Sequence, residues 1–160
     1  VSMEKNMQTL FDIEEIKQLK ARYFRGIDTC NLELLQTVLS NDVHIRFDSP
    51  TYQYEINGIN EAMDFYRNAF THRRFGMHNG HTPEIKVEGD SATGIWYLND
   101  LFINLDEQTI LTGSALYEDC YIKVSGQWRI QRTGYKRLLE MIEPLSSGCR
   151  ITSQPVANIS

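Results

Sequence analysis

The stretch TPEIKVEGDSATGIWYL (residues 82–98) shows most clearly how the chain folds. Two runs rich in β-branched and aromatic residues flank the sequence Glu88-Gly89-Asp90-Ser91. Turn residues between two such runs are typical of a β-hairpin. The stretch therefore predicts two antiparallel strands that follow one another directly.

The same pattern continues toward the C-terminus. Turn sequences at residues 105–108 and 125–127 separate further β-rich runs, and the last of these runs reaches the segment GYKRL (134–138). Residues 82–138 are thus expected to form four long antiparallel strands joined by tight turns.

In the N-terminal half, the apolar residues recur with a different period. Apolar residues at steps of three and four predict helices over residues 12–27, 31–39 and 59–71. Asp12, with Glu15 three residues later, is expected to cap the first helix, and Asn31 the second. Residues 42–48 and a short run before Gly58 are expected to be strands. Helices separated from a meandering sheet predict an α+β fold.

Length and composition indicate one globular unit. The chain has 160 residues, of which 41% are hydrophobic and 23% charged. A chain of this size buries roughly 68–70% of its unfolded surface, enough for a core and a cavity. We expect a flexible N-terminus at residues 1–9, one domain over 10–145 and a polar tail at 146–160, which a neighbouring subunit could order.

Charge and cysteine content exclude several classes of protein. The net charge of −5 argues against a nucleic-acid-binding protein. Cys30, Cys120 and Cys149 are odd in number and far apart, which fits neither a disulfide framework nor a zinc site. No apolar run is long enough to span a membrane. A reduced, cytoplasmic protein without membrane contact is the expectation.

Tyr23 and Asp28 form the first candidate site. Tyr23 lies on the apolar stripe of the first helix, so its ring should be buried and its hydroxyl needs a partner. Asp28 follows the end of that stripe. It is either a turn or cap residue, as Asp often is, or a carboxylate directed into a cavity.

His78 and His81 form the second candidate site. On a strand, residues three apart point to opposite faces, which disfavours a metal site. Regular alternation with Ile85 and Val87 would direct His81 inward. A β-bulge near Gly80 and Pro83 would instead direct His78 inward. The residues leave both alternatives open.

Tyr135 and Arg137, at the end of the last expected strand, form the third. They share one face of that strand. An arginine directed into a cavity could bind a carboxylate or polarise an oxygen, whereas an arginine at a strand end is more often solvated.

Three longer segments together resemble the SnoaL-like branch of the nuclear transport factor 2-like superfamily. They are residues 16–47 (IKQLKARYFRGIDTCNLELLQTVLSNDVHIRF), 76–100 (GMHNGHTPEIKVEGDSATGIWYLND) and 113–138 (GSALYEDCYIKVSGQWRIQRTGYKRL). The resemblance covers residues 10–140. It implies a cone-like, cystatin-like α+β barrel, in which a strongly curved antiparallel sheet of mixed order wraps three N-terminal helices around a deep apolar pocket.

The resemblance also implies roles for residues. The family includes scytalone dehydratase, bile acid 7α-dehydratase, ketosteroid isomerase and polyketide cyclases. By position, Tyr23, Asp28 and His78 match its catalytic residues, and Arg137 matches more loosely. His81, Tyr135, Trp96 and Tyr117 are the expected substrate-binding residues.

We therefore expect an enzyme: a lyase of the dehydratase type, or an isomerase, acting by His/Asp acid–base chemistry on a small apolar carbonyl compound such as a steroid, polyketide or aromatic. Neither a metal nor an organic cofactor is indicated. Two alternatives are a non-catalytic small-molecule binding module and a structural subunit resembling the β subunit of ring-hydroxylating dioxygenases. The resemblance also implies a homodimer through the outer sheet face.

Overall fold

The computed structural model describes residues 2–155. The helices are α1 (Met3–Asp28), α2 (Leu32–Val38) and α3 (Gly58–Ala69). The strands are β1 (Leu39–Asp48), β2 (Gln53–Asn57), β3 (Arg74–Glu88), β4 (Ser91–Asn104), β5 (Thr109–Val124) and β6 (Gln127–Pro144). The three turns expected from sequence are therefore confirmed, since each falls between consecutive strands from β3 to β6.

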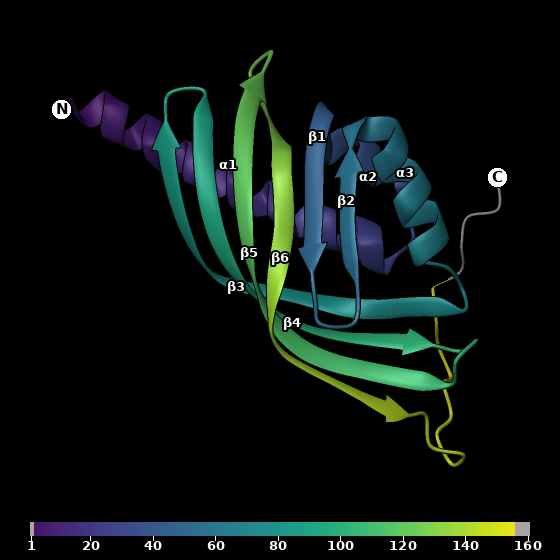
Figure 1. Ribbon diagram of the computed structural model, residues 1–160. Coiled ribbons are helices and arrows are strands. Elements are labelled where there is room, and N and C mark those ends of the chain that lie inside the picture. Colours follow the sequence, from purple (N-terminus) through teal and green to yellow (C-terminus); the bar gives the residue numbers. More distant parts are fainter. Residues whose placement is uncertain (1, 156–160) are drawn as a thin grey trace.

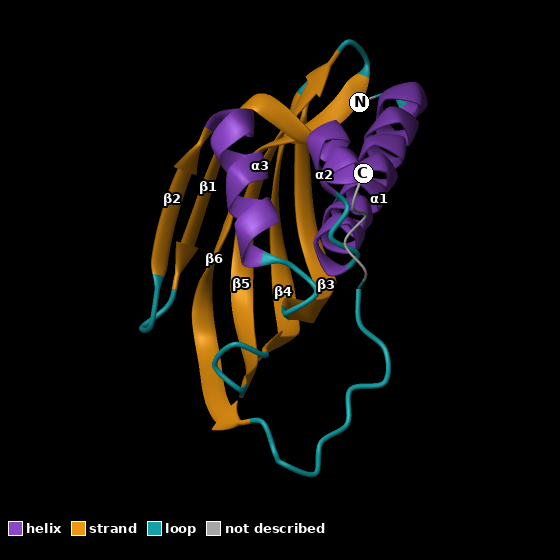
Figure 2. Ribbon diagram, turned by 90° about the vertical axis from the view of Figure 1, so that its right-hand side faces the viewer, coloured by secondary structure: helices purple, strands orange, loops and turns teal. Residues whose placement is uncertain are grey.

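The strands form one six-stranded sheet in the order β2-β1-β6-β5-β4-β3. β1 runs parallel to β6, and all other neighbours are antiparallel. The long strands bend along their length (Figure 1), and the helices lie on one side of the sheet (Figure 2). The α+β fold is confirmed, with a sheet that is strongly curved but not closed into a barrel.

The core lies between the helices and the inner face of the sheet. Buried apolar residues of α1 meet buried residues of the central strands; they include Ile16, Leu19, Tyr23, Ile27, Val43, Ile45, Leu98, Tyr117 and Ile130. Each fully buried aliphatic side chain of this kind contributes about 1.5–3 kcal/mol to folding. This packing fixes the end of α1 against the inner face of the sheet, beside the edge strand β3.

Helix α1 begins earlier than expected. Its N-cap is Ser2, whose side chain accepts a hydrogen bond from the Lys5 amide, so residues 3–9 are helical and not a loose terminus. Asp12 is not a cap. It is buried and accepts hydrogen bonds from Lys123 Nζ (2.5 Å) and Trp128 Nε1 (3.0 Å). These partners come from the β5–β6 hairpin, which no local pattern reveals.

Two strands are longer than expected. β3 begins at Arg74, so His78 and His81 lie within the strand. β6 continues to Pro144, which places Arg137 within the strand and not at its end. In the described part of the expected tail, residues 146–155 carry no helix or strand, and the Gln154 side chain donates to the His72 carbonyl (3.1 Å). Residues 156–160 lie outside the described residues.

No helix among residues 2–155 combines the length and the apolar character that crossing a membrane requires.

Candidate functional site

A pocket of about 410 Å³ lies between α3, the end of α1 and the inner face of the sheet. Its volume falls within the range typical of small-molecule sites, roughly 300–1,000 Å³. Phe and Tyr supply nine of its 21 lining residues: Phe47, Tyr52, Tyr54, Phe65, Tyr66, Phe70, Phe102, Tyr117 and Tyr135. Its buried polar side chains come from β3, β4 and β6.

His78 and Asp28 meet at this pocket. The Asp28 carboxylate accepts two hydrogen bonds from one residue, from His78 Nδ1 (2.6 Å) and from the His78 backbone amide (3.0 Å). Asp28 is the last residue of α1, which the packing of that helix holds beside β3. Of the two possibilities that the residues left open, the structure shows the carboxylate directed at the pocket histidine and not a cap.

The hydrogen bond defines the tautomer of His78. An ionised carboxylate can only accept, so Nδ1 carries the hydrogen, and in the neutral imidazole Nε2 then has a free lone pair. Nε2 has no hydrogen-bond partner among residues 2–155. Every buried side-chain nitrogen or oxygen in that range does have a partner, so Nε2 is not buried and is accessible. His78 lines the pocket, with Phe24 stacked on its ring and Phe70 at its edge. Nε2 is thus an accessible base in an aromatic setting.

A β-bulge decides which histidine faces inward. The pairing of β3 with β4 shifts register between His81 and Glu84, and Thr82 has a φ of 51°. This irregularity reverses the alternation upstream of Ile85. His78 is directed inward, while His81 is exposed and bonds Asn99 on the outer face (2.8 Å). His81, which was expected to bind substrate, therefore lies outside the pocket.

Tyr23 does not line the pocket. Its side chain has no exposed area, and its hydroxyl lies 2.8 Å from the Tyr66 hydroxyl. Burial raises the pKa of Tyr23 well above its usual value. The predicted role as direct donor to a substrate oxygen is corrected, because Tyr66 is the lining residue and Tyr23 supports it from behind.

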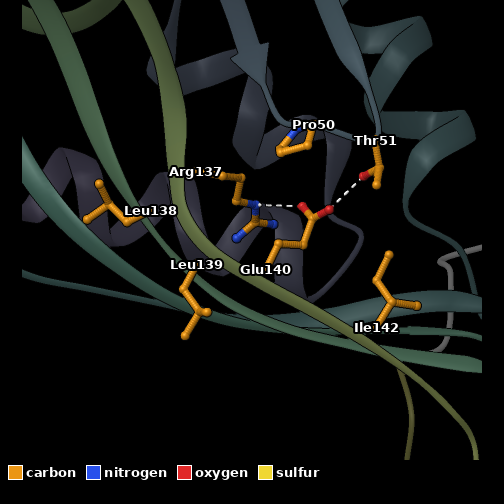
Figure 3. A pocket seen from close by; sticks show the side chains of 7 residues that line it. All are labelled: Pro50, Thr51, Arg137, Leu138, Leu139, Glu140 and Ile142. Carbon is orange, nitrogen blue, oxygen red and sulfur yellow. Dashed lines mark hydrogen bonds and ion pairs between the residues drawn. The ribbon is translucent and has the colours of Figure 1, made fainter.

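Arg137 lines the pocket but already has partners. Its guanidinium donates to both oxygens of Asp100 (2.5 and 2.8 Å) and lies 3.3 Å from Glu140. Figure 3 shows Glu140 between Arg137 and Thr51 of the β1–β2 turn. Burial alone would lower the pKa of Arg137, but Asp100 outweighs it and the pKa is raised. Arg137 is thus neither solvated nor free to bind a substrate carboxylate.

Of the other residues expected to bind substrate, some line the pocket and one does not. Tyr117 and Tyr135 line the pocket. Trp96 does not. It is buried elsewhere under the sheet and donates from Nε1 to the Tyr121 hydroxyl (2.9 Å). It is core, as an aromatic residue on the inner face of a strand usually is.

Sequence reasoning missed several site residues. Asp100 has a readable signal, because it shares the inward parity of Trp96 and Leu98 on β4 and is a carboxylate on an apolar face. Tyr52 has none, since it lies in the irregular β1–β2 connection. Glu140 was missed because β6 was expected to end before it.

Metal binding has no support in the geometry of the described chain. Among residues 2–155 there is no group of three or more His, Cys, Asp or Glu side chains placed to hold an ion.

Three solved structures with different names have a fold similar to that of this chain. A hexachlorocyclohexane dehydrochlorinase, LinA type 3 from Novosphingobium barchaimii, has a TM-score of 0.77 and 17% identity over 92% of this chain and 99% of its own. A candidate scytalone dehydratase from Novosphingobium aromaticivorans has a TM-score of 0.74 and 15% identity over 94% and 96%. A protein of unknown function from Mycobacterium tuberculosis has a TM-score of 0.72 and 25% identity over 86% and 78%.

At these identities the first two structures establish the fold alone. The sequence itself matches the family model of the SnoaL-like domain over residues 8–134, which spans α1 through the first part of β6. The chain therefore belongs to the SnoaL-like domain family.

Proposed function

We propose that the protein is a cofactor-independent lyase of the dehydratase type, or an isomerase, that removes a proton next to a carbonyl group of a small, largely apolar compound. The observation that carries this proposal is the hydrogen bond between Asp28 and His78 Nδ1, which leaves Nε2 as a base at an aromatic pocket. The names of two proteins with this fold, a dehydrochlorinase and a candidate dehydratase, both denote eliminations.

The chemistry follows from the tautomer. His78 Nε2 accepts the proton from the carbon beside the carbonyl, and the C–H electron pair moves toward the carbonyl oxygen to form an enolate. In a dehydration, the enolate electrons then form the new carbon–carbon double bond as the bond to a β-hydroxyl breaks. The imidazolium returns the proton to the departing hydroxyl, so the products are an enone and water.

Asp28 has two effects on this step. It holds the imidazole ring in one orientation, and its negative charge stabilises the imidazolium that forms. Positioned proton transfer of this kind is worth roughly 10²–10⁴ in rate.

The test is a set of neutral β-hydroxy ketones, incubated with the protein and followed by the ultraviolet absorption of the conjugated enone. The wild type should form enone from at least one member, and His78→Ala should reduce that rate to the uncatalysed level. Asp28→Asn should reduce it by about 10²-fold or more.

His81→Ala is the matched control, because His81 lies on the outer face and should leave the rate unchanged. The proposal is wrong if compounds of the set bind in the pocket but the wild type forms enone no faster than His78→Ala does. The protein is then a binding module.

A further inference from the structure

We infer that the Tyr135 hydroxyl is the donor that holds the substrate's oxygen, and that the pocket selects neutral molecules over anions. The inference rests on the proposed function, since it takes the same pocket as the substrate site. It follows from the hydrogen-bonding capacity of the groups at the Arg137 end of the pocket and from their charges.

The direction of the hydrogen bond between Tyr52 and Tyr135 follows from the number of lone pairs on the Tyr52 oxygen. The Tyr52 and Tyr135 hydroxyls lie 2.6 Å apart, and either could donate. However, the Tyr52 oxygen also accepts from two N–H groups of Arg137, from Nε (3.1 Å) and Nη2 (3.0 Å). A hydroxyl has two lone pairs and one hydrogen. With both lone pairs occupied, Tyr52 must donate to Tyr135.

The hydroxyl hydrogen of Tyr135 then takes no part in the hydrogen bond with Tyr52. Among residues 2–155 the Tyr135 hydroxyl has no hydrogen-bond partner except Tyr52. Tyr135 lines the pocket, so its O–H is available to an acceptor there. The chain from Arg137 through Tyr52 to Tyr135 polarises this O–H, since hydrogen bonds in series strengthen one another.

The charges near the pocket disfavour an anion. Arg137 is enclosed by Asp100 and Glu140, whose side chains are 4% and 7% exposed, and Asp28 lies at the histidine end. Arg74 and Glu107 also line the pocket and add one charge of each sign, so carboxylates outnumber guanidiniums there by four to two. An anionic ligand would add like charge in a partly desolvated site, which is costly.

The ligand class follows from these two features. It is a neutral molecule with an apolar, ring-containing body that packs against the aromatic wall and a carbonyl or ether oxygen that accepts from Tyr135. An enolate oxygen formed in the reaction would accept the same hydrogen bond more strongly, because charged acceptors bind hydrogen more tightly than neutral ones.

Three probes of nearly equal shape separate these properties: 2-acetylnaphthalene, which has a neutral acceptor; 2-isopropylnaphthalene, which has none; and 2-naphthoate, which is anionic. Calorimetric titration of the full chain should show the ketone binding about three- to tenfold more tightly than the hydrocarbon, as one hydrogen bond allows. The naphthoate should bind most weakly.

Tyr135→Phe should abolish the preference for the ketone. Tyr54→Phe is the matched control. Tyr54 lines the same pocket but lies outside the hydrogen-bonded chain, and its replacement should leave the preference intact. The infrared carbonyl stretch of bound 2-acetylnaphthalene should lie at lower frequency in the wild type than in Tyr135→Phe, a readout that altered packing alone would not produce.

The inference is wrong if the ketone and hydrocarbon bind equally, if Tyr135→Phe keeps both the preference and the infrared shift, or if naphthoate binds best. These outcomes are distinct from failure of the proposed function, because binding is scored without turnover. The His78→Ala protein, which should form no enone, should retain the full preference for the ketone.

Discussion

Lys20 is a charged residue in the middle of the core. Its side chain has no exposed area, and Nζ lies 2.8 Å from Asp119 Oδ2 and 3.7 Å from the centre of the Tyr117 ring. Thr133 and Tyr121 each donate a hydrogen bond to the Asp119 carboxylate (2.6 and 2.7 Å). Burial lowers the pKa of Lys20, and Asp119 opposes that effect. The pair joins α1 to β5 behind the pocket wall.

Lys20→Met should destabilise the protein, because it leaves Asp119 charged and buried without its cation. Removing one partner of a buried pair typically lowers the free energy of unfolding by about 3–5 kcal/mol. Urea denaturation measures this directly. The double variant Lys20→Met/Asp119→Asn should recover part of the loss, since the uncompensated charge is gone.

Lys17→Met is the control on the same helix, because Lys17 pairs with Glu14 at the surface (3.7 Å). A surface pair of this kind is worth about 0–1 kcal/mol. A Lys20→Met protein as stable as Lys17→Met would show that the buried pair contributes nothing to the fold.

Strand β3 and the end of α1 together position the His78 ring. Gly80 on β3 faces the Phe24 ring of α1, and a Cβ atom at Gly80 would collide with that ring. Phe24 in turn stacks on His78 with ring centroids 6.0 Å apart. The absence of a side chain at Gly80 therefore lets α1 bring both Phe24 and Asp28 to His78.

Gly80→Ala should displace the Phe24 ring and lower the free energy of unfolding by about 1–3 kcal/mol, the usual cost of overpacking. Thermal denaturation measures the stability, and the NMR resonances of the His78 ring should shift. Gly148→Ala is the control, since the nearest atom to a Cβ there is 3.8 Å away. Equal stability and unchanged His78 resonances in both variants would contradict this account of Gly80.

Local patterns predicted the elements well and their contacts poorly. The hairpin turns and the Asn31 cap could be read from sequence because a turn or a cap is decided by neighbouring residues. The inward histidine could not, because the bulge depends on pairing between β3 and β4. The partners of Asp12 and Arg137 are likewise far away in the chain, and helix or strand periods contain no information on them.

At the scale of the whole molecule, the buried tyrosines link stability to pH. Burial raises the pKa values of Tyr23, Tyr66 and Tyr117 well above 10.0, the value in the unfolded chain. Above pH 10 the folded protein therefore holds more protons than the unfolded one. The stabilisation is fully present below that pH and is lost as the pH rises above it.

The free energy of unfolding should therefore fall steeply above about pH 10, and urea denaturation at a series of pH values checks this. Tyr66→Phe should reduce the slope by about one proton, because it removes one of the buried hydroxyls with a raised pKa, a group that also includes Tyr121. A free energy that stays constant as the exposed tyrosines ionise would contradict the burial of these hydroxyls.

The outer face of the sheet is the proposed homodimer interface. Ile95 and Tyr97 are 43% and 45% exposed there, close to the charged Glu84, Lys86 and Glu118. Size-exclusion chromatography with light scattering should give twice the chain mass, and Tyr97→Glu should shift the protein toward monomer. A strict monomer in the wild type would rule out this assembly.

We propose that His78 Nε2, oriented by Asp28, removes a proton beside a carbonyl in this pocket. The most direct measurement is proton NMR of 2-acetylnaphthalene incubated with the protein in D₂O. We predict that the wild type accelerates exchange of the hydrogens next to the carbonyl, that Asp28→Asn slows this exchange, and that His78→Ala abolishes it. Exchange at the same rate with wild type, His78→Ala and buffer, while the ketone is bound, would contradict the claim.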